Sequence, residues 1–292
     1  MTESIEGRPS PAFRSVVVAT DFQPPARAAV TWAARHLAGD GDLLLVRVVA
    51  DDSVRESADE ALRERVAELA MLGMPGVRSE VRVGDPADEI VRAAEEHAVD
   101  LIVLGEHAER TGFGQLLGGT GASVARRASV PVLIARNVVT DAPRTLLVAL
   151  HDSPTMPQLL AWVERLATRF SASVTAIHVV PPSSSMPLMS SGVGVDPDRP
   201  LELLTDSAER WLETAVASLR SRVGTLTTSV VFGDPAAEIL AAADRIHADI
   251  VVVGRGGVGR LVGRLLDGTT ERVLRVGEAA LLIVPATQSR SR

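Results

Sequence analysis

The chain has 292 residues, enough for two domains of ordinary size, and 46% of them are hydrophobic, which supports real cores. Its net charge of -7 argues against binding to the phosphate backbone of nucleic acids, and its 3% aromatic content argues against platforms that stack bases. Because there is no cysteine, disulfides, thiolate chemistry and sulfur-ligated zinc are excluded.

The N-terminal stretch MTESIEGRPSPAFR does not resemble a secretory signal, since it lacks a basic start followed by an apolar region. No apolar run approaches the roughly 20 residues needed to span a bilayer. We therefore expect a cytoplasmic protein with neither membrane nor nucleic acid among its partners.

Strands and helices alternate along the first half of the sequence. Short runs of branched apolar residues predict buried parallel strands near 15–20, 43–49, 78–83, 101–104 and 130–135. Between them, a helix opens after paired prolines with Val30, Ala33, Ala34 and Leu37 on one face, and a second helix repeats this pattern with Leu62, Val66 and Leu69.

The second half repeats the first. GDPADEI at 84–90 recurs as GDPAAEI at 233–239, an offset of 149 residues (233 minus 84). DLIVLG and LLGGT recur at the same offset as DIVVVG and LLDGT. Further upstream, VVVATDFQP at 16–24 corresponds to LLVALHDSP at 146–154, so the second half carries extra residues, which we place in the Pro-, Ser- and Gly-rich segment 181–200.

These patterns predict two tandem α/β domains, at 13–138 and 143–286, joined by a linker near 137–144. Each is expected to be a doubly wound, five-stranded parallel sheet with flavodoxin-like layering. The final strands, at 131–136 and 280–285, are apolar edge candidates that we expect to pair with each other.

Two short motifs allow both a structural and a functional interpretation. The aspartate of GDPA favours a helix cap, with proline in the first turn. Asp21 ends the first strand, where ligands of open parallel sheets gather, and its carboxylate suits an adenine amino group or a ribose hydroxyl. It could equally cap the next helix.

A glycine-rich loop follows the fourth strand of each half and leads to the final helix, so backbone N–H groups could face an anion. It is no Walker loop, because the chain has no lysine and Gly268 is followed directly by Thr269. A nest of N–H donors, threonine hydroxyls and a divalent cation could hold phosphate instead, although a flexible turn with threonine as helix cap is the alternative.

The order VATDF, GDPA, DLIVLG and a loop of the form Gly-x2-Gly-x9-Gly-Ser/Thr resembles the universal stress protein family, here as a tandem pair. This resemblance implies an adenine-nucleotide-binding fold that associates through its last strands and acts in stress regulation, with some members binding no nucleotide. ATP with Mg²⁺ is the ligand expected on these grounds.

Carried over by position, the resemblance implies adenosine contacts at Thr20, Asp21 and Val48. The phosphate contacts that it implies in the first half fall on Gly105, His107, Gly118, Gly119 and Thr120. Ala108 stands where a glycine is usual, and Gly119 lacks the hydroxyl that serine or threonine would supply, a role that Thr120 could take.

In the second half, the corresponding positions are His151, Val179, Gly254, Gly257, Gly268 and Thr269. His151 replaces the aspartate, and Asp267 occupies the third glycine position unless the loop carries one extra residue. The first half therefore retains the better adenine end and the second half the better glycines.

We predict an ATP-binding regulatory protein, an intramolecular pseudo-dimer that also forms a homodimer. A nucleotide-free scaffold of the same fold and a slow ATPase are the alternatives. No catalytic residue and no protein metal ligand is assigned, because no histidine has metal-ligand spacing and no hydrolase motif is present. The segment 181–200 could be a surface loop or a lid.

Overall fold

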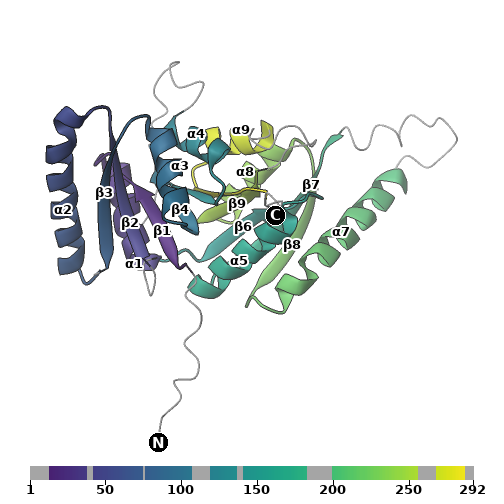
Figure 1. Cartoon of the computed structure of the whole chain (residues 1–292). Coiled ribbons are helices and arrows are strands. Elements are labelled where there is room, and N and C mark those ends of the chain that lie inside the picture. Colours follow the sequence, from purple (N-terminus) through teal and green to yellow (C-terminus); the bar gives the residue numbers. More distant parts are fainter. Residues whose placement is uncertain are drawn as a thin grey trace, which may run out of the picture. The chain divides into compact units, whose positions relative to one another are not determined.

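The computed structural model describes residues 13–37, 42–74, 76–106, 119–136, 141–182, 199–255 and 268–286. Contacts divide the chain into two compact units, Met1–Gly105 and Glu106–Arg292, both built from alternating strands and helices (Figure 1). Most of the segment 181–200 and half of the linker 137–144 lie outside the described residues.

The first unit has a four-stranded parallel sheet in the order β3-β2-β1-β4. Its elements are β1 (Ser15–Ala19), α1 (Pro24–His36), β2 (Asp42–Val49), η1 (Asp52–Val54), α2 (Arg55–Met71), β3 (Val77–Val83), α3 (Pro86–Glu96) and β4 (Leu101–Gly105). The connections through α1 and α2 run in one direction across the sheet and that through α3 runs back. Right-handed crossovers therefore place α3 on the opposite face.

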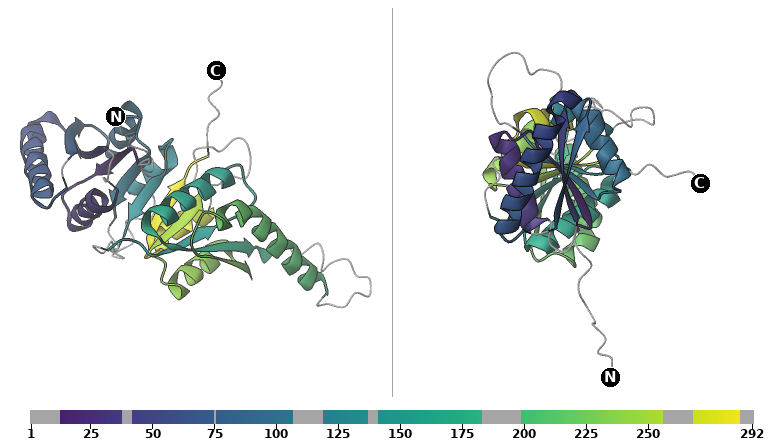
Figure 2. Two further views of the ribbon diagram at one scale, coloured as in Figure 1. Left: turned by 90° about the horizontal axis from the view of Figure 1, so that it is seen from below. Right: turned by 60° about the vertical axis from the view of Figure 1, so that its left-hand side comes forward.

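The second unit contains the last helix and strand of the first repeat together with the second repeat. Its elements are α4 (Thr120–Arg127), β5 (Val132–Ala135), β6 (Thr145–Ala149), α5 (Met156–Phe170), β7 (Ser173–Val180), α7 (Arg199–Arg220), β8 (Leu226–Phe232), α8 (Pro235–Arg245), β9 (Ile250–Gly254), α9 (Gly268–Val276) and β10 (Ala280–Val284). The strand order is β5-β10-β9-β6-β7-β8. The 22-residue helix α7 packs against β7 and β8 (Figure 2).

Strands β5 and β10 pair with each other, as predicted. The pairing is antiparallel, with Leu281 opposite Ile134, Leu282 opposite Leu133 and Ile283 opposite Val132. All six side chains are buried, so this seam belongs to the hydrophobic core of the second unit.

The helices bury the faces that their spacing predicts. Val30, Ala33, Ala34 and Leu37 are buried beneath α1, which begins at the paired prolines because a missing N–H costs nothing in a first turn. In α2, Leu62 and Leu69 are buried, whereas Val66 is only partly so. No helix in the described part of the chain is long and apolar enough to cross a bilayer.

Aspartates fix the same local geometry in both repeats. The GDPA aspartates are helix caps, since Asp85 Oδ1 accepts from the N–H groups of Ala87 and Asp88 and Asp234 Oδ1 from that of Ala237. The structural interpretation of this motif is therefore confirmed.

A second pair of aspartates, Asp100 and Asp249, was not singled out from the sequence. Asp100 Oδ2 accepts from two backbone N–H groups where β1 starts, at 2.7 and 3.3 Å, and Asp249 Oδ2 does the same where β6 starts, at 2.7 and 2.9 Å. Each carboxylate thus ties the beginnings of two neighbouring strands together.

Candidate functional site

The turn after β1 carries the residues expected to contact adenosine. Thr20 is buried, its N–H donates to Val46 O at 2.9 Å, and its hydroxyl accepts from Phe22 N at 3.0 Å. Asp21 is exposed, and its Oδ1 accepts from Gln23 N at 2.9 Å, directly before α1. Asp21 therefore closes an Asx turn, which is a local structural role that leaves its carboxylate at the surface.

Arg47, at the end of β2, was missed by sequence reasoning. Its Nη1 lies 3.3 Å from Thr20 O, and its guanidinium carbon lies 5.5 Å from the centre of the Phe22 ring. Phe22 has a positive φ of 65°, which a bulky residue rarely adopts. Parallel pairing of β1 with β2 brings Arg47 and half-buried Val48 to the same sheet edge as Asp21.

Gly105, at the end of β4, is required by packing. A Cβ placed there would lie 2.5 Å from Pro25 O and 2.6 Å from Ala26 Cα, because the start of α1 crosses closely over the strand end. Gly254 of the second repeat is crowded by side chains rather than backbone, since an added Cβ would lie 2.7 Å from Thr155 Oγ1. Both glycines thus have a structural reason that is independent of any ligand.

The starts of α4 and α9 have few described neighbours. Among the residues that the structure describes, nothing lies within 4 Å of a Cβ added at Gly119 or Gly268, and Thr120 is exposed at the first position of α4. The two helices differ in charge, since the first turn of α4 has no acidic residue and that of α9 contains Glu271. An anion is therefore favoured more strongly at the start of α4.

In the second unit, β6 pairs with both β7 and β9, so His151, Val179 and Gly254 come to one sheet edge. His151 is exposed and Val179 half-buried. At the position corresponding to Arg47, His178 donates from Nδ1 to Leu150 O at 2.9 Å, and its ring lies 4.5 Å from that of Trp211. Both repeats thus have a side chain that donates to the backbone carbonyl just after their first strand, an arginine in the first and a histidine in the second.

Three of the expected phosphate contacts, His107, Gly118 and Gly257, lie outside the described residues, as do Ala108 and Asp267. The expected contacts of the first repeat that the structure describes are divided between the two units. The adenosine contacts Thr20, Asp21 and Val48 and the phosphate contact Gly105 belong to the first unit. The phosphate contacts Gly119 and Thr120 belong to the second. In the part of the chain that the structure describes, no cluster of three or more His, Asp or Glu side chains could hold a metal ion.

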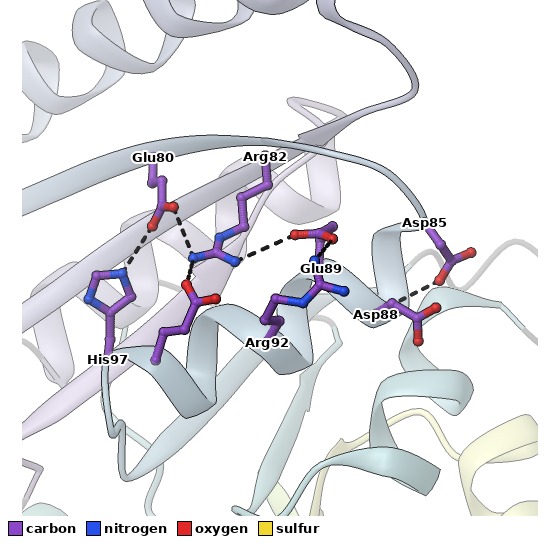
Figure 3. A network of polar contacts seen from close by, with 8 residues as sticks. Glu80, Arg82, Asp85, Asp88, Glu89, Arg92 and His97 are labelled. Atoms are coloured by element: carbon purple, nitrogen blue, oxygen red, sulfur yellow. Dashed lines mark hydrogen bonds and ion pairs between the residues drawn. The ribbon is translucent and has the colours of Figure 1, made fainter.

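Away from the strand ends, β3 and α3 share an ionic network (Figure 3). Arg82 is buried and contacts three carboxylates, with Glu80 at 2.9 Å, Glu89 at 3.5 Å and Glu96 closer still. Burial lowers the pKa of Arg82, but the hydrogen bond to Glu96 and the charges of Glu80 and Glu96 outweigh it and leave that pKa raised. The hydrogen bond from Arg82 in turn lowers the pKa of Glu96.

The network continues through His97, whose Nε2 lies 3.0 Å from Glu80 Oε2. Glu80 and Arg82 belong to β3, Glu89 and Glu96 belong to α3, and His97 directly follows α3, so the network holds this helix to the edge strand of its sheet.

Comparison with known proteins finds the same family along both repeats. The model of the universal stress protein family matches residues 12–136 and again 143–285. Universal stress protein Rv1636 of Mycobacterium tuberculosis is 31% identical over 140 residues, which cover 42% of this chain and 96% of that protein.

Among solved structures, a universal stress protein from Archaeoglobus fulgidus aligns with a TM-score of 0.68 at 20% identity, over 94% of this chain and 97% of that one. This likeness shows the fold. A universal stress protein in complex with cAMP is 31% identical and covers 44% of this chain and 98% of its own, with a TM-score of 0.37.

Proposed function

Because this chain belongs to the universal stress protein family, we propose that it is a cytoplasmic regulator that binds ATP together with Mg²⁺. Occupancy of the nucleotide site biases its conformation or its assembly, including formation of a homodimer.

The observation that carries the proposal is the position of Asp21 and Gly105. In the strand order β3-β2-β1-β4, the chain runs outward from β1 and then returns to β4, so the topological switch point lies between β1 and β4. Ligands of open α/β sheets bind outside the carboxyl ends of the strands at this point. The exposed Asp21 carboxylate and Gly105 stand at these two strand ends.

The family resemblance places the phosphate contacts at the starts of α4 and α9. Such helix starts suit an anion, because backbone N–H groups at Gly119, Thr120, Gly268 and Thr269 would donate to it with the helix dipole behind them. The absence of lysine from the sequence leaves these donors and arginine to balance the charge. The weaker anion preference at α9 and the loss of the aspartate at His151 make the first repeat the stronger site.

Magnesium fits this arrangement only together with the nucleotide. The ion usually keeps several waters and is held by substrate phosphates with few protein ligands. Mg²⁺ would therefore neutralise phosphate charge and be retained through the phosphates, with the exposed Asp21 carboxylate as one protein oxygen at these strand ends.

One observation favours the alternative, a nucleotide-free scaffold. Gly105, Gly254 and Asp21 each have a packing or turn-closing role, so these residues would serve the fold even without a ligand. In this case the paired β5 and β10 would be the functional feature, as a rigid seam between two repeats.

Mass spectrometry of freshly purified, denatured protein separates the two functions. Co-purified adenine nucleotide, or calorimetric binding of ATP with Mg²⁺ that is weakened in Asp21→Ala, supports the proposal. Protein that carries no nucleotide and gives no binding heat with ATP, ADP or cAMP would leave the scaffold as the function. Release of phosphate in the presence of Mg²⁺ would reveal a slow ATPase.

A further inference from the structure

Arg255, directly after β9, reaches the carboxyl end of α4. Its Nη1 lies 2.7 Å from Ala128 O and 3.1 Å from each of Ala125 O and Arg126 O. The residue is only 8% exposed, and this burial lowers its pKa. The terminal carbonyls of a helix lack intrahelical partners and form the negative end of the helix dipole, so a buried guanidinium is stabilised there.

Arg136, directly after β5, makes the reciprocal contact with α9. Its Nη1 lies 2.8 Å from Gly277 O, and its Nη2 donates to Leu274 O. A Cβ at Gly277 would lie 3.5 Å from Nη1, so the glycine leaves room for the guanidinium. On its other side, Arg136 Nε donates to Glu106 Oε2 at 3.0 Å.

The carbonyls that accept these bonds are equivalent in the two repeats, but the arginines are not. Ala125 and Ala128 correspond to Leu274 and Gly277 at the repeat offset of 149 (274 minus 125). By the same offset Arg255 corresponds to Glu106, and Arg136 corresponds to Pro285. Two unrelated positions thus place a guanidinium at the same end of each final helix, and in both cases the arginine comes from the opposite repeat.

Each contact is also linked to the glycine at the switch point. Arg255 follows Gly254, and its N–H donates to Val284 O at 2.7 Å. Glu106 follows Gly105, and its N–H donates to Ala135 O at 3.1 Å while its carboxylate holds Arg136. The residue after each glycine is therefore connected, directly or through Arg136, to the helix of the other repeat.

We propose that Arg136 and Arg255 are positioning residues that couple the two repeats, so that nucleotide bound to one repeat shifts the final helix of the other. This inference rests on the proposed function, because α4 and α9 begin at the expected phosphate contacts. Each guanidinium is attached to a strand end and hydrogen-bonded to a helix end. If the strand end moves, the helix end must therefore move with it or the hydrogen bonds must break. Close-packed interiors transmit such displacements.

Hydrogen exchange of the whole protein tests the coupling. The reporters are the amides of Ala128 and Gly277, which bond to Val124 O at 2.8 Å and Val273 O at 2.9 Å at the two helix ends. Exchange is measured with and without ATP and Mg²⁺ at one bound nucleotide per chain, as counted by native mass spectrometry. If both repeats bind, Asp21→Ala lowers the affinity of the first, and ATP is kept at a concentration that leaves this repeat largely unoccupied.

In the otherwise unchanged chain, we expect ATP to slow exchange at both reporters by fivefold or more. In the double variant Arg136→Met with Arg255→Met, it should slow exchange only in the repeat that holds the nucleotide, with affinity changed less than threefold. The matched control, Arg272→Met with Arg275→Met, removes two exposed ion pairs of α9 and should behave like the unchanged chain.

Two results would overturn the coupling but not the proposal of ATP binding. One is slowed exchange in only one repeat of the unchanged chain, and the other is slowed exchange at both reporters of the methionine variant. No bound ATP at all would instead refute the proposed function and the coupling with it. If the methionine pair does not fold, Arg136→Lys with Arg255→Lys retains the charges but not the forked donors, and should at least halve the effect at the distant reporter.

Discussion

Replacement of Gly105 by alanine tests whether packing, rather than a ligand, demands this glycine. The new Cβ would lie 2.5 Å from Pro25 O and 2.6 Å from Ala26 Cα, and both are backbone atoms that no rotamer change can move away. The start of α1 must therefore shift by several tenths of an ångström. Overpacking of this kind costs about 1–3 kcal/mol, and a rigid backbone neighbour favours the upper part of that range.

Thermal unfolding measured by circular dichroism, without nucleotide, provides the assay. A loss of about 2–3 kcal/mol in a unit of this size lowers the midpoint by roughly 10 °C. Gly268→Ala is the matched control, because no atom of the described residues lies within 4 Å of its added Cβ, so little change in the midpoint is expected. A Gly105→Ala midpoint within about 2 °C of the unchanged chain would refute the packing argument.

Three further predictions concern the ligand, the ionic network and the seam. Asp21→Ala should weaken ATP binding by about 1–3 kcal/mol and GTP binding by less, because the carboxylate is expected to accept a hydrogen bond from adenine or ribose. Equal calorimetric affinities of the variant and the unchanged chain would exclude this contact. Because the pKa of Glu96 lies below its usual 4.5, the stability that its pair with Arg82 contributes is complete above that pH and is lost as the pH falls through the lowered pKa. Glu96→Gln should therefore destabilise the protein at neutral pH and progressively less in acid, and a deficit that stays constant in thermal unfolding across this range would contradict the assignment. Leu282→Ala, at a side chain 1% exposed in the seam, should cost about 2–5 kcal/mol in chemical denaturation, whereas Leu203→Ala at 60% exposure should change stability by about 0.5 kcal/mol or less; similar losses would show that the seam contributes little.

Local features of the structure could be predicted because they depend on neighbouring residues. The aspartate of GDPA caps its helix through N–H groups two and three residues away, and the paired prolines start α1 because of their own geometry. Apolar runs and helical spacing indicate buried faces in the same way. The pairing of β5 with β10 was predicted because both strands are apolar edge candidates of duplicated units and because the family that the sequence resembles associates through its last strands.

Only those residues of the candidate site that lie at the ends of apolar strands could be predicted from the sequence. Asp21 and Gly105 stand out in sequence because each ends an apolar run, but Arg47 carries no such signal. Its contact with Thr20 O depends on the register that sets Ala19 beside Val46, which no local pattern reports. The close approach of Pro25 to Gly105 likewise depends on the path of α1 across the sheet.

The sequence by itself thus determined the duplication, the alternation of strands and helices, the helix caps and the apolar edges that meet. Only the tertiary structure decided which arginines bridge the two repeats. Arg136 and Arg255 occupy non-equivalent positions and bond to carbonyls more than a hundred residues away, on helices that the antiparallel register of β5 and β10 brings within reach. Backbone carbonyls carry no sequence signature, so a side chain that binds them can be recognised only when the folded backbone is known.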